Sequence, residues 1–214
     1  MIKIKALFKE KIHVVARNLI LSNIFASTGW AFINPVFAIY VVDKIKGGNI
    51  QVVGICYFIY WITKGILQLF VSDYLDRVEG EADDYFTLIL GQFLDLIVPL
   101  AFLLVKNTGE LYLVFFIYGI ADSLYVPPWN SIFTRYLNIK RISFEWALNS
   151  TGVNLGSALA ILMGSSLALI FGFPLTFIFV ALCQAISFII LLSLKKYFIS
   201  KKKPYLDYYI PLKS

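Results

Sequence analysis

The sequence is poor in charge and in the residues that build catalytic and metal sites. Charged residues make up 15% of its 214 positions, whereas soluble domains carry about 25%. This shortage excludes a disordered chain, a coiled coil and an ordinary soluble domain. There is one histidine, His13, so a histidine-based metal site within one chain is excluded, and no metal or other cofactor is expected. The two cysteines, Cys56 and Cys183, lie in apolar runs and give no evidence of a redox compartment.

What is abundant is apolar residues, which make up 59% of the chain and give a mean hydropathy of +0.78. Because a helix needs about 20 apolar residues to cross a bilayer, we predict an all-α integral membrane protein with six transmembrane helices. They are expected at residues 15–42, 50–72, 84–105, 110–136, 144–170 and 173–195. The first stretch is too long for a signal peptide, and the continuous apolar runs argue against a transmembrane β-barrel.

The basic residues predict how these spans are oriented. Fifteen of the 19 lysines and arginines fall on the side that holds both termini, three fall on the other side, and Lys64 lies inside a span. The positive-inside rule therefore places both termini in the cytoplasm. The chain is expected to divide into a basic arm (1–14), a membrane domain (15–195) and a basic tail (196–214) that contacts lipid headgroups. With the net charge of +6 explained by topology, no nucleic-acid partner is expected.

Three charged residues lie inside predicted spans, where a charge costs about 2.5–3.5 kcal/mol on insertion scales. Lys64 is in the second span, Asp95 in the third and Asp122 in the fourth. A short loop joins spans two and three, so we expect Lys64 and Asp95 to pair. Asp122 has no obvious cationic partner. It is either a protonated structural acid, a group facing a water-filled cavity, or a group that binds a ligand or carries protons.

Polar and aromatic side chains follow the helical spacing i, i+4, i+7, i+11 in three spans. Because lipid does not solvate amides and charges, these stripes are expected to face a polar cavity. Aromatic stripes on their own are more often packing. The members are Asn23, Ser27, Trp30 and Asn34 in the first span, Tyr57, Trp61, Lys64 and Gln68 in the second, and Tyr118, Asp122, Tyr125 and Trp129 in the fourth.

The fifth span carries a row of small residues every four positions, which permits close approach of another helix. Its members are Gly152, Gly156, Ala160 and Gly164. This row is either a packing face within the chain or a dimerising face. Prolines mark kinks or helix ends, and the pair Pro127-Pro128 in the fourth span is the strongest candidate for a bent helix.

The chain resembles one half of a major facilitator superfamily transporter over nearly its whole length. Residues 65–77 are similar to the family's loop between helices two and three, with Asp73 as the acid of an inner-gate latch and Arg77 as a base. Residues 119–135 are similar to the fourth helix, which implies that Arg135 pairs with Asp73. Residues 147–164 are similar to the fifth helix.

The resemblance implies that helices one, two, four and five line the transport path, so that Asp95 on helix three supports Lys64. Family halves are related by an axis along the membrane normal. A parallel homodimer is therefore expected, in which the glycine row of the fifth span meets the second span of the partner. A second six-helix chain is the alternative partner.

We therefore predict a half-size secondary active transporter in the plasma membrane, not an enzyme. It would work by alternating access on a small polar or amphiphilic solute, with Asp122 carrying protons or binding a cation and Lys64 setting the charge of the cavity. No phosphate-binding loop is present. Two alternatives remain. One is a non-transporting or lipid-moving membrane protein. The other is an intramembrane aspartyl protease that uses Asp95 and Asp122.

Overall fold

The computed structural model describes residues 12–78 and 80–199, and the regular elements within them are helices. They are α2 (Val14–Ile33), α3 (Phe37–Lys44), α4 (Ile50–Arg77), α5 (Ala82–Phe102), α6 (Thr108–Tyr136), the 3-10 turn η1 (Ile139–Arg141), α7 (Ile142–Phe171), α8 (Phe173–Leu192) and α9 (Lys195–Ile199). Five are long and apolar enough to cross a membrane, and there are six if the bent pair α2–α3 is counted as one span. The predicted all-helical membrane fold is confirmed. Residues 1–11 of the predicted arm and 200–214 of the tail lie outside the described residues.

The first predicted span is two helices. Between α2 and α3 the chain breaks at residues 34–36, and the two axes meet at 46°. Pro35 explains the break, because its nitrogen has no hydrogen to donate and its ring crowds the preceding turn. By contrast, α6 continues as one helix through Pro127 and Pro128. Pro35 therefore stands at a break between two helices, whereas Pro127 and Pro128 lie within one continuous helix.

Asparagine caps and a glycine fix where three other helices begin. Asn49 Oδ1 accepts from the N–H of Val52 at 3.1 Å at the start of α4. Asn107 Oδ1 accepts from the N–H of Glu110 at 3.0 Å at the start of α6. Such caps satisfy N–H groups that the first helical turn leaves unpaired. Between α7 and α8 stands only Gly172, whose φ of 83° lies in the left-handed region that favours glycine.

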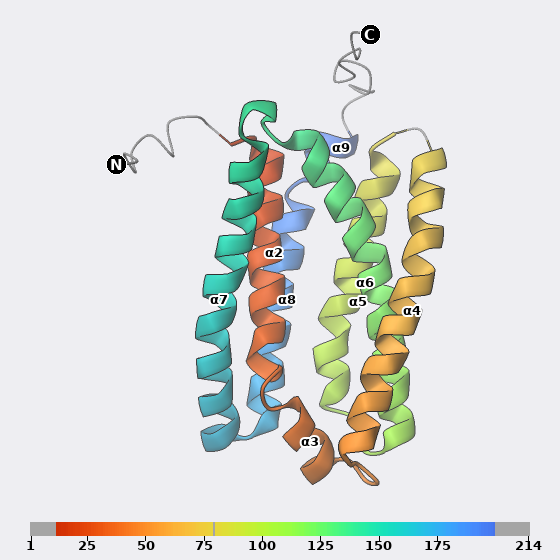
Figure 1. Ribbon diagram of the computed structural model, residues 1–214, viewed down its shortest axis with the longest axis vertical. Coiled ribbons are helices and arrows are strands. Elements are labelled where there is room, and N and C mark those ends of the chain that lie inside the picture. The colour runs from red at the N-terminus through yellow and green to blue at the C-terminus, as the bar shows by residue number, and fades with distance from the viewer. Residues whose placement is uncertain (1–11, 79, 200–214) are drawn as a thin grey trace.

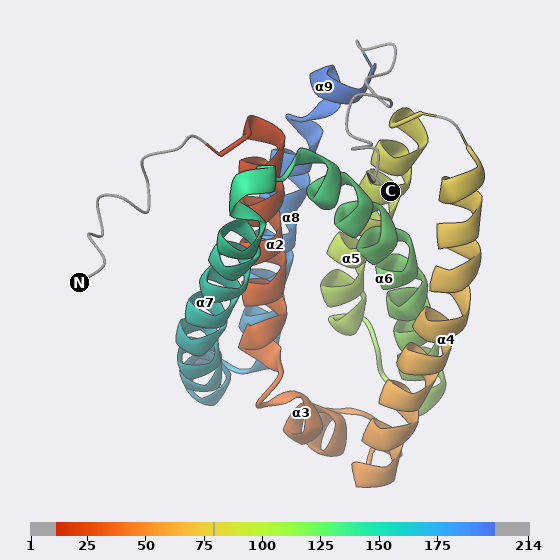
Figure 2. The ribbon, with the colours of Figure 1, turned by 45° about the horizontal axis from the view of Figure 1, so that its top comes forward.

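The spans pack as two groups of three, α2 with α7 and α8, and α4 with α5 and α6. Figure 1 shows α4 and α7 at the edges of the nearer face, with α2 and α6 between them and α5 and α8 behind. Figure 2 shows the same order from a tilted view. The helices α4 and α7 are also the least buried spans. One broad face of the bundle is therefore bounded by the two helices that pack least within the chain.

A buried polar network joins the two groups behind this face. Gln92 of α5 donates to Gln184 Oε1 of α8 at 2.8 Å, and Ser187 donates to Gln92 Oε1 at 3.1 Å. Gln184 in turn donates to the carbonyl of Ala26 on α2 at 3.2 Å. Because bilayer lipid offers no partner for amides, this network stabilises the contact of α5 with α8 and of α8 with α2.

Replacing Gln92 with leucine is expected to lower the free energy of unfolding by about 1–2 kcal/mol, because Gln184 Oε1 loses its donor and the Ser187 hydroxyl loses its acceptor. The measurement is the thermal unfolding midpoint in detergent, followed by tryptophan fluorescence. Gln51→Leu, at an exposed position in the first turn of α4, is the matched control. Equal midpoints for Q92L and Q51L would contradict a stabilising role for the network.

Candidate functional site

A lysine and an aspartate form an ion pair between α4 and α6. Lys64 Nζ lies 2.8 Å from Asp122 Oδ2, and each side chain is 16% exposed. The hydroxyl of Tyr60 donates to the same carboxylate oxygen at 2.5 Å and accepts from Lys64 at 3.2 Å. The Lys64 ammonium also lies 5.3 Å from the ring centroid of Trp61, a cation–π distance. The pair is therefore held by several contacts and remains accessible.

A stack of three aromatic rings links this pair to a second carboxylate. Tyr60 stacks on Tyr118 at 4.4 Å, and Tyr118 stacks on Trp30 at 4.3 Å. The indole N–H of Trp30 then reaches both oxygens of Asp95, at 3.2 and 3.1 Å. Asp95 is 5% exposed. Spacing of four residues on α4 (Tyr60, Lys64) and on α6 (Tyr118, Asp122) turns these side chains to one face of each helix.

We call Trp30, Tyr60, Lys64, Asp95, Tyr118 and Asp122 the central cluster. Four different helices contribute to it. Its net charge is −1 when both carboxylates are ionised and Lys64 is protonated. Asp95 has an indole as its hydrogen-bond donor and no ion-pair partner among the described residues. A buried carboxylate in this setting avoids the penalty of an isolated charge by taking up a proton or by pairing with a cation that enters the site.

Only part of the predicted stripes meets in this cluster. Trp30, Lys64, Tyr118 and Asp122 do, with Trp61 beside Lys64. The other predicted cavity residues lie elsewhere. Ser27 contacts Asn23, which hydrogen-bonds to Asn149 of α7. Asn34 is exposed at the break, Gln68 is half-buried further along α4, and Tyr57 packs against Phe37 and Phe115. Tyr125 and Trp129 lie in an apolar cluster, where the indole of Trp129 donates to the Leu19 carbonyl.

Tyr60 is the cluster member that the sequence patterns missed. The stripe chosen in the second span starts at Tyr57 and passes through Trp61. Tyr60 lies about one helical turn before Lys64, at i−4, and this spacing is the signal in the sequence that points to it. Its hydroxyl is the shared contact of the charge pair.

The predicted pairing of Lys64 with Asp95 is wrong. The ammonium of Lys64 contacts Asp122, for which the sequence offers no obvious cationic partner. The reason is that α4 packs along α6, whereas α5 packs on α6 and α8. A short connection between two helices does not make their polar faces meet.

The predicted latch between Asp73 and Arg135 is also wrong. Asp73 pairs with Arg77 of its own helix at 2.9 Å, where both side chains are well exposed and the pair contributes little. Arg135 instead pairs with Asp84 and with Glu81, the latter at 3.6 Å. The end of α6 packs along the start of α5, so the acidic residues at the start of α5 lie within ion-pair distance of Arg135.

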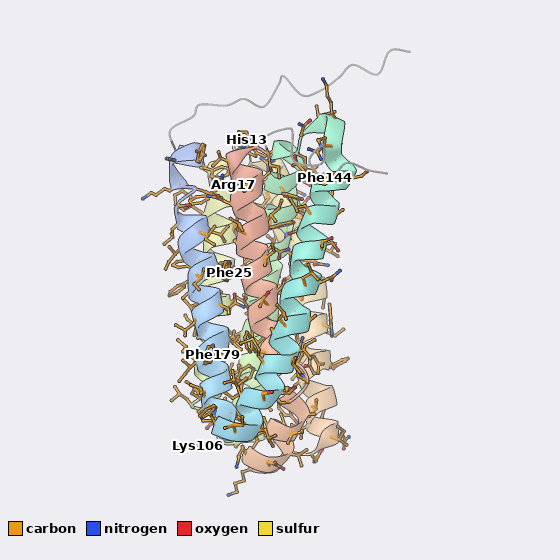
Figure 3. All side chains as sticks on the ribbon, turned by 90° about the vertical axis from the view of Figure 1, so that its left-hand side faces the viewer. His13, Arg17, Phe25, Lys106, Phe144 and Phe179 are labelled. Atoms are coloured by element: carbon orange, nitrogen blue, oxygen red, sulfur yellow. The ribbon has the colours of Figure 1, made fainter. Side chains whose placement is uncertain are left out.

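The glycine row of α7 packs against α2 of the same chain. Figure 3 shows the two helices side by side. A Cβ atom on Gly152 would meet Ile24, one on Gly156 would meet Thr28, and one on Gly164 would meet the backbone of Phe32. Within the chain the row is therefore a packing face against α2, which is one of the two roles that the sequence leaves open. The opposite side of α7 remains exposed.

Comparisons with known proteins agree with this architecture. The profile described as Major Facilitator Superfamily matches residues 19–207. Among solved structures, the crystal structure of the POT family transporter PepTSo, obtained in meso, matches with a TM-score of 0.72 at 13% identity. The match covers 91% of this chain and 41% of that one, so the chain spans about two fifths of the length of this transporter. No curated protein gives a significant sequence match.

Proposed function

The chain belongs to the major facilitator superfamily, and from that premise we propose that it is half of a secondary active transporter. It is an integral, multi-pass membrane protein with a transporter fold. In our proposal it moves a small polar or amphiphilic solute across the cytoplasmic membrane by alternating access, with both termini in the cytoplasm. The central cluster is the observation that supports this most strongly.

The cluster has the properties that a solute site in a membrane requires. Lys64 lies near the middle of α4, so the charges are far from either end of the bundle. Intramembrane charges are costly and are retained where they face a pathway or a partner. The 16% exposure of Lys64 and Asp122 leaves both side chains partly accessible. Trp61 beside them adds an aromatic wall for a solute with apolar parts.

The two carboxylates support a coupling role. Asp122 is held by Lys64 and Tyr60, whereas Asp95 has a single indole donor. We propose that a proton or a cation enters this cluster with the solute and alters the Lys64–Asp122 pair. If the Lys64 ammonium exchanged its partner, the relative stability of two arrangements of α4 and α6 would change. A conformational switch requires such a difference in interaction between its two states.

The exposed faces of α4 and α7 support a second bundle as the missing half. They carry large apolar residues at regular spacing: Phe58, Ile62, Ile66, Leu69 and Phe70 on α4, and Leu155, Leu159, Leu162 and Met163 on α7. We propose that a second copy covers them in a parallel dimer, because identical chains favour closed twofold symmetry. The twofold axis would place the two central clusters opposite each other, and a second six-helix chain is the alternative partner.

Transport is tested with proteoliposomes that hold a trapped pH-sensitive dye. The panel of probes contains amino acids, short peptides, sugars, nucleosides and organic cations, each added under an imposed pH gradient. Proton movement that depends on one of these solutes, and is absent from protein-free vesicles, would support coupled transport. If none of the solutes alters proton movement and none accumulates inside the vesicles, the transport proposal is wrong.

The mass of the purified protein in nanodiscs tests the dimer. We expect twice the chain mass of 24.3 kDa once lipid and scaffold are subtracted. Leu159→Glu, which places a charge on the exposed face of α7, is expected to give monomers, because a charge is expensive in an apolar interface. Leu104→Glu, at an exposed site just after α5, is the control. A wild-type monomer would overturn the homodimer and direct the search to a different partner chain.

The two alternatives draw less support from the site. A protease needs two acids that share a proton, whereas Asp122 is paired with Lys64 and Asp95 with Trp30. A lipid-moving protein needs a groove for a headgroup. Peptide cleavage that depends on both acids would favour the first, and movement of labelled lipid between leaflets would favour the second.

A further inference from the structure

A cavity of about 900 Å³ lies at the end of the bundle opposite the start of α2 and opposite α9, apart from the central cluster. It is formed by α3, the end of α5, the end of α7 and the start of α8. The break at Pro35 creates it, because α3 turns 46° from the α2 axis that α7 and α8 follow. Its size is that of a small-molecule site. The residues that line it include Tyr40, Asp43, Lys44, Phe102, Ala168 and Phe177.

The interior of this cavity is mostly apolar, and two of its side-chain hydroxyls are already paired. The hydroxyl of Tyr40 donates to the carbonyl of Phe102 at 2.8 Å. The hydroxyl of Ser165 donates to the carbonyl of Ile161 at 2.9 Å. The aromatic rings of Tyr40, Phe102 and Phe177 contact one another. The aromatic rings and the pairing of these hydroxyls favour a hydrocarbon group in this part of the cavity.

The mouth of the cavity, in contrast, carries two charges of opposite sign. Asp43 and Lys44 both line the cavity and are exposed, and neither has an ion-pair partner among the described residues. They stand in the last turn of α3, at the level where the helices end, which is where lipid headgroups lie in a bilayer. Exposed apolar side chains, Ile39 and Leu169, flank the opening, so lipid chains have direct access to it.

We propose that this cavity binds a zwitterionic glycerophospholipid from the surrounding leaflet. One acyl chain fills the aromatic interior. The phosphate contacts the ammonium of Lys44, and the cationic end of the headgroup contacts the carboxylate of Asp43. The adjacent carboxylate disfavours a purely anionic headgroup, because like charges repel at short range. This site is independent of the solute site and does not rest on the proposed transport.

Native mass spectrometry of the full chain tests the proposal. The protein is released from micelles that contain equal amounts of phosphatidylcholine and phosphatidylglycerol, and the lipids retained on the intact protein are identified by mass. We expect retained phosphatidylcholine in excess. K44Q and D43N are each expected to lower that retention about tenfold, as loss of one charge-assisted contact does. A168F, which fills the cavity, is expected to remove it.

Lys46→Gln and Leu90→Phe are the matched controls, because neither residue lines the cavity, and both are expected to retain lipid as the wild type does. If A168F does not fold, the two charge variants decide the question alone. Retention that is unchanged in K44Q and D43N would overturn the headgroup contacts. Preference for phosphatidylglycerol, or loss of the cavity lipid on dimerisation, would overturn the proposed occupant.

Discussion

D122N is expected to abolish solute-dependent proton movement in dye-loaded proteoliposomes. The substitution removes the charge that neutralises Lys64 and leaves an ammonium without its ion-pair partner. Removing one member of such a pair costs about 2–5 kcal/mol, which corresponds to between about thirtyfold and several thousandfold in rate or affinity. K64Q is expected to have a similar effect, because it leaves Asp122 with Tyr60 as its remaining donor in this cluster.

The double variant K64Q/D122N separates a structural pair from a functional one. It removes both charges, so no unpaired ion remains, and its unfolding midpoint is expected to recover toward the wild-type value. Transport is not expected to recover, because the exchange of partners that we propose needs both charges. Wild-type flux in the double variant would show that the pair serves stability only.

Tyr60→Phe provides a milder test of the same site. It removes the hydroxyl that bonds Asp122 and Lys64 and keeps the ring that stacks on Tyr118. We expect a smaller loss of flux than in D122N, with little change in unfolding. Tyr57→Phe, on the same helix and outside the cluster, is its control.

Gly164→Leu is expected to prevent the bundle from folding. A Cβ atom at this position would overlap the backbone of Phe32, and backbone cannot move aside as a flexible side chain can. The two helices would have to separate along the contact that joins α2 to α7. We expect a loss of about 3 kcal/mol or more, at the upper end for overpacked sites. The measurement is the yield of monodisperse protein and its unfolding midpoint.

The matched control is Gly54→Leu on α4, where a Cβ atom would meet nothing within 4 Å. This variant makes the same change in size and should fold as the wild type does. Equal yields and midpoints for G164L and G54L would contradict the close packing of α7 on α2. An intermediate result is expected for Gly156→Leu, since there the neighbour is the side chain of Thr28 rather than backbone.

The sequence identified most of the residues in the central cluster but not their partners. Lys64, Asp95 and Asp122 were recognised because a charge within an apolar span needs a reason. Helical spacing added Trp30 and Tyr118. Neither argument says which helices are neighbours. The loop between α4 and α5 suggested one pairing, and the packing of α4 along α6 produced another.

The same distinction explains Arg135 and the glycine row. Arg135 is expected from the resemblance to meet Asp73, and the glycine row is expected to meet either a helix of its own chain or a partner. Arg135 pairs with the acidic start of α5, and the row lies on α2 of its own chain. A sequence shows which residues need a partner, because charged residues and rows of glycine can be recognised in it. It does not show which segment supplies that partner.

What the sequence determined by itself is the environment of this protein and its class. Hydrocarbon offers no hydrogen bonds, so long apolar runs must become helices that span the bilayer, and 59% apolar residues leave no other fold. What only the tertiary structure decided is which helix faces meet, where the first span breaks at Pro35, and that a cavity forms beside that break. These features depend on packing between segments far apart in the chain. Side-chain periodicity shows which face of a helix needs a neighbour, but it does not show which helix supplies it.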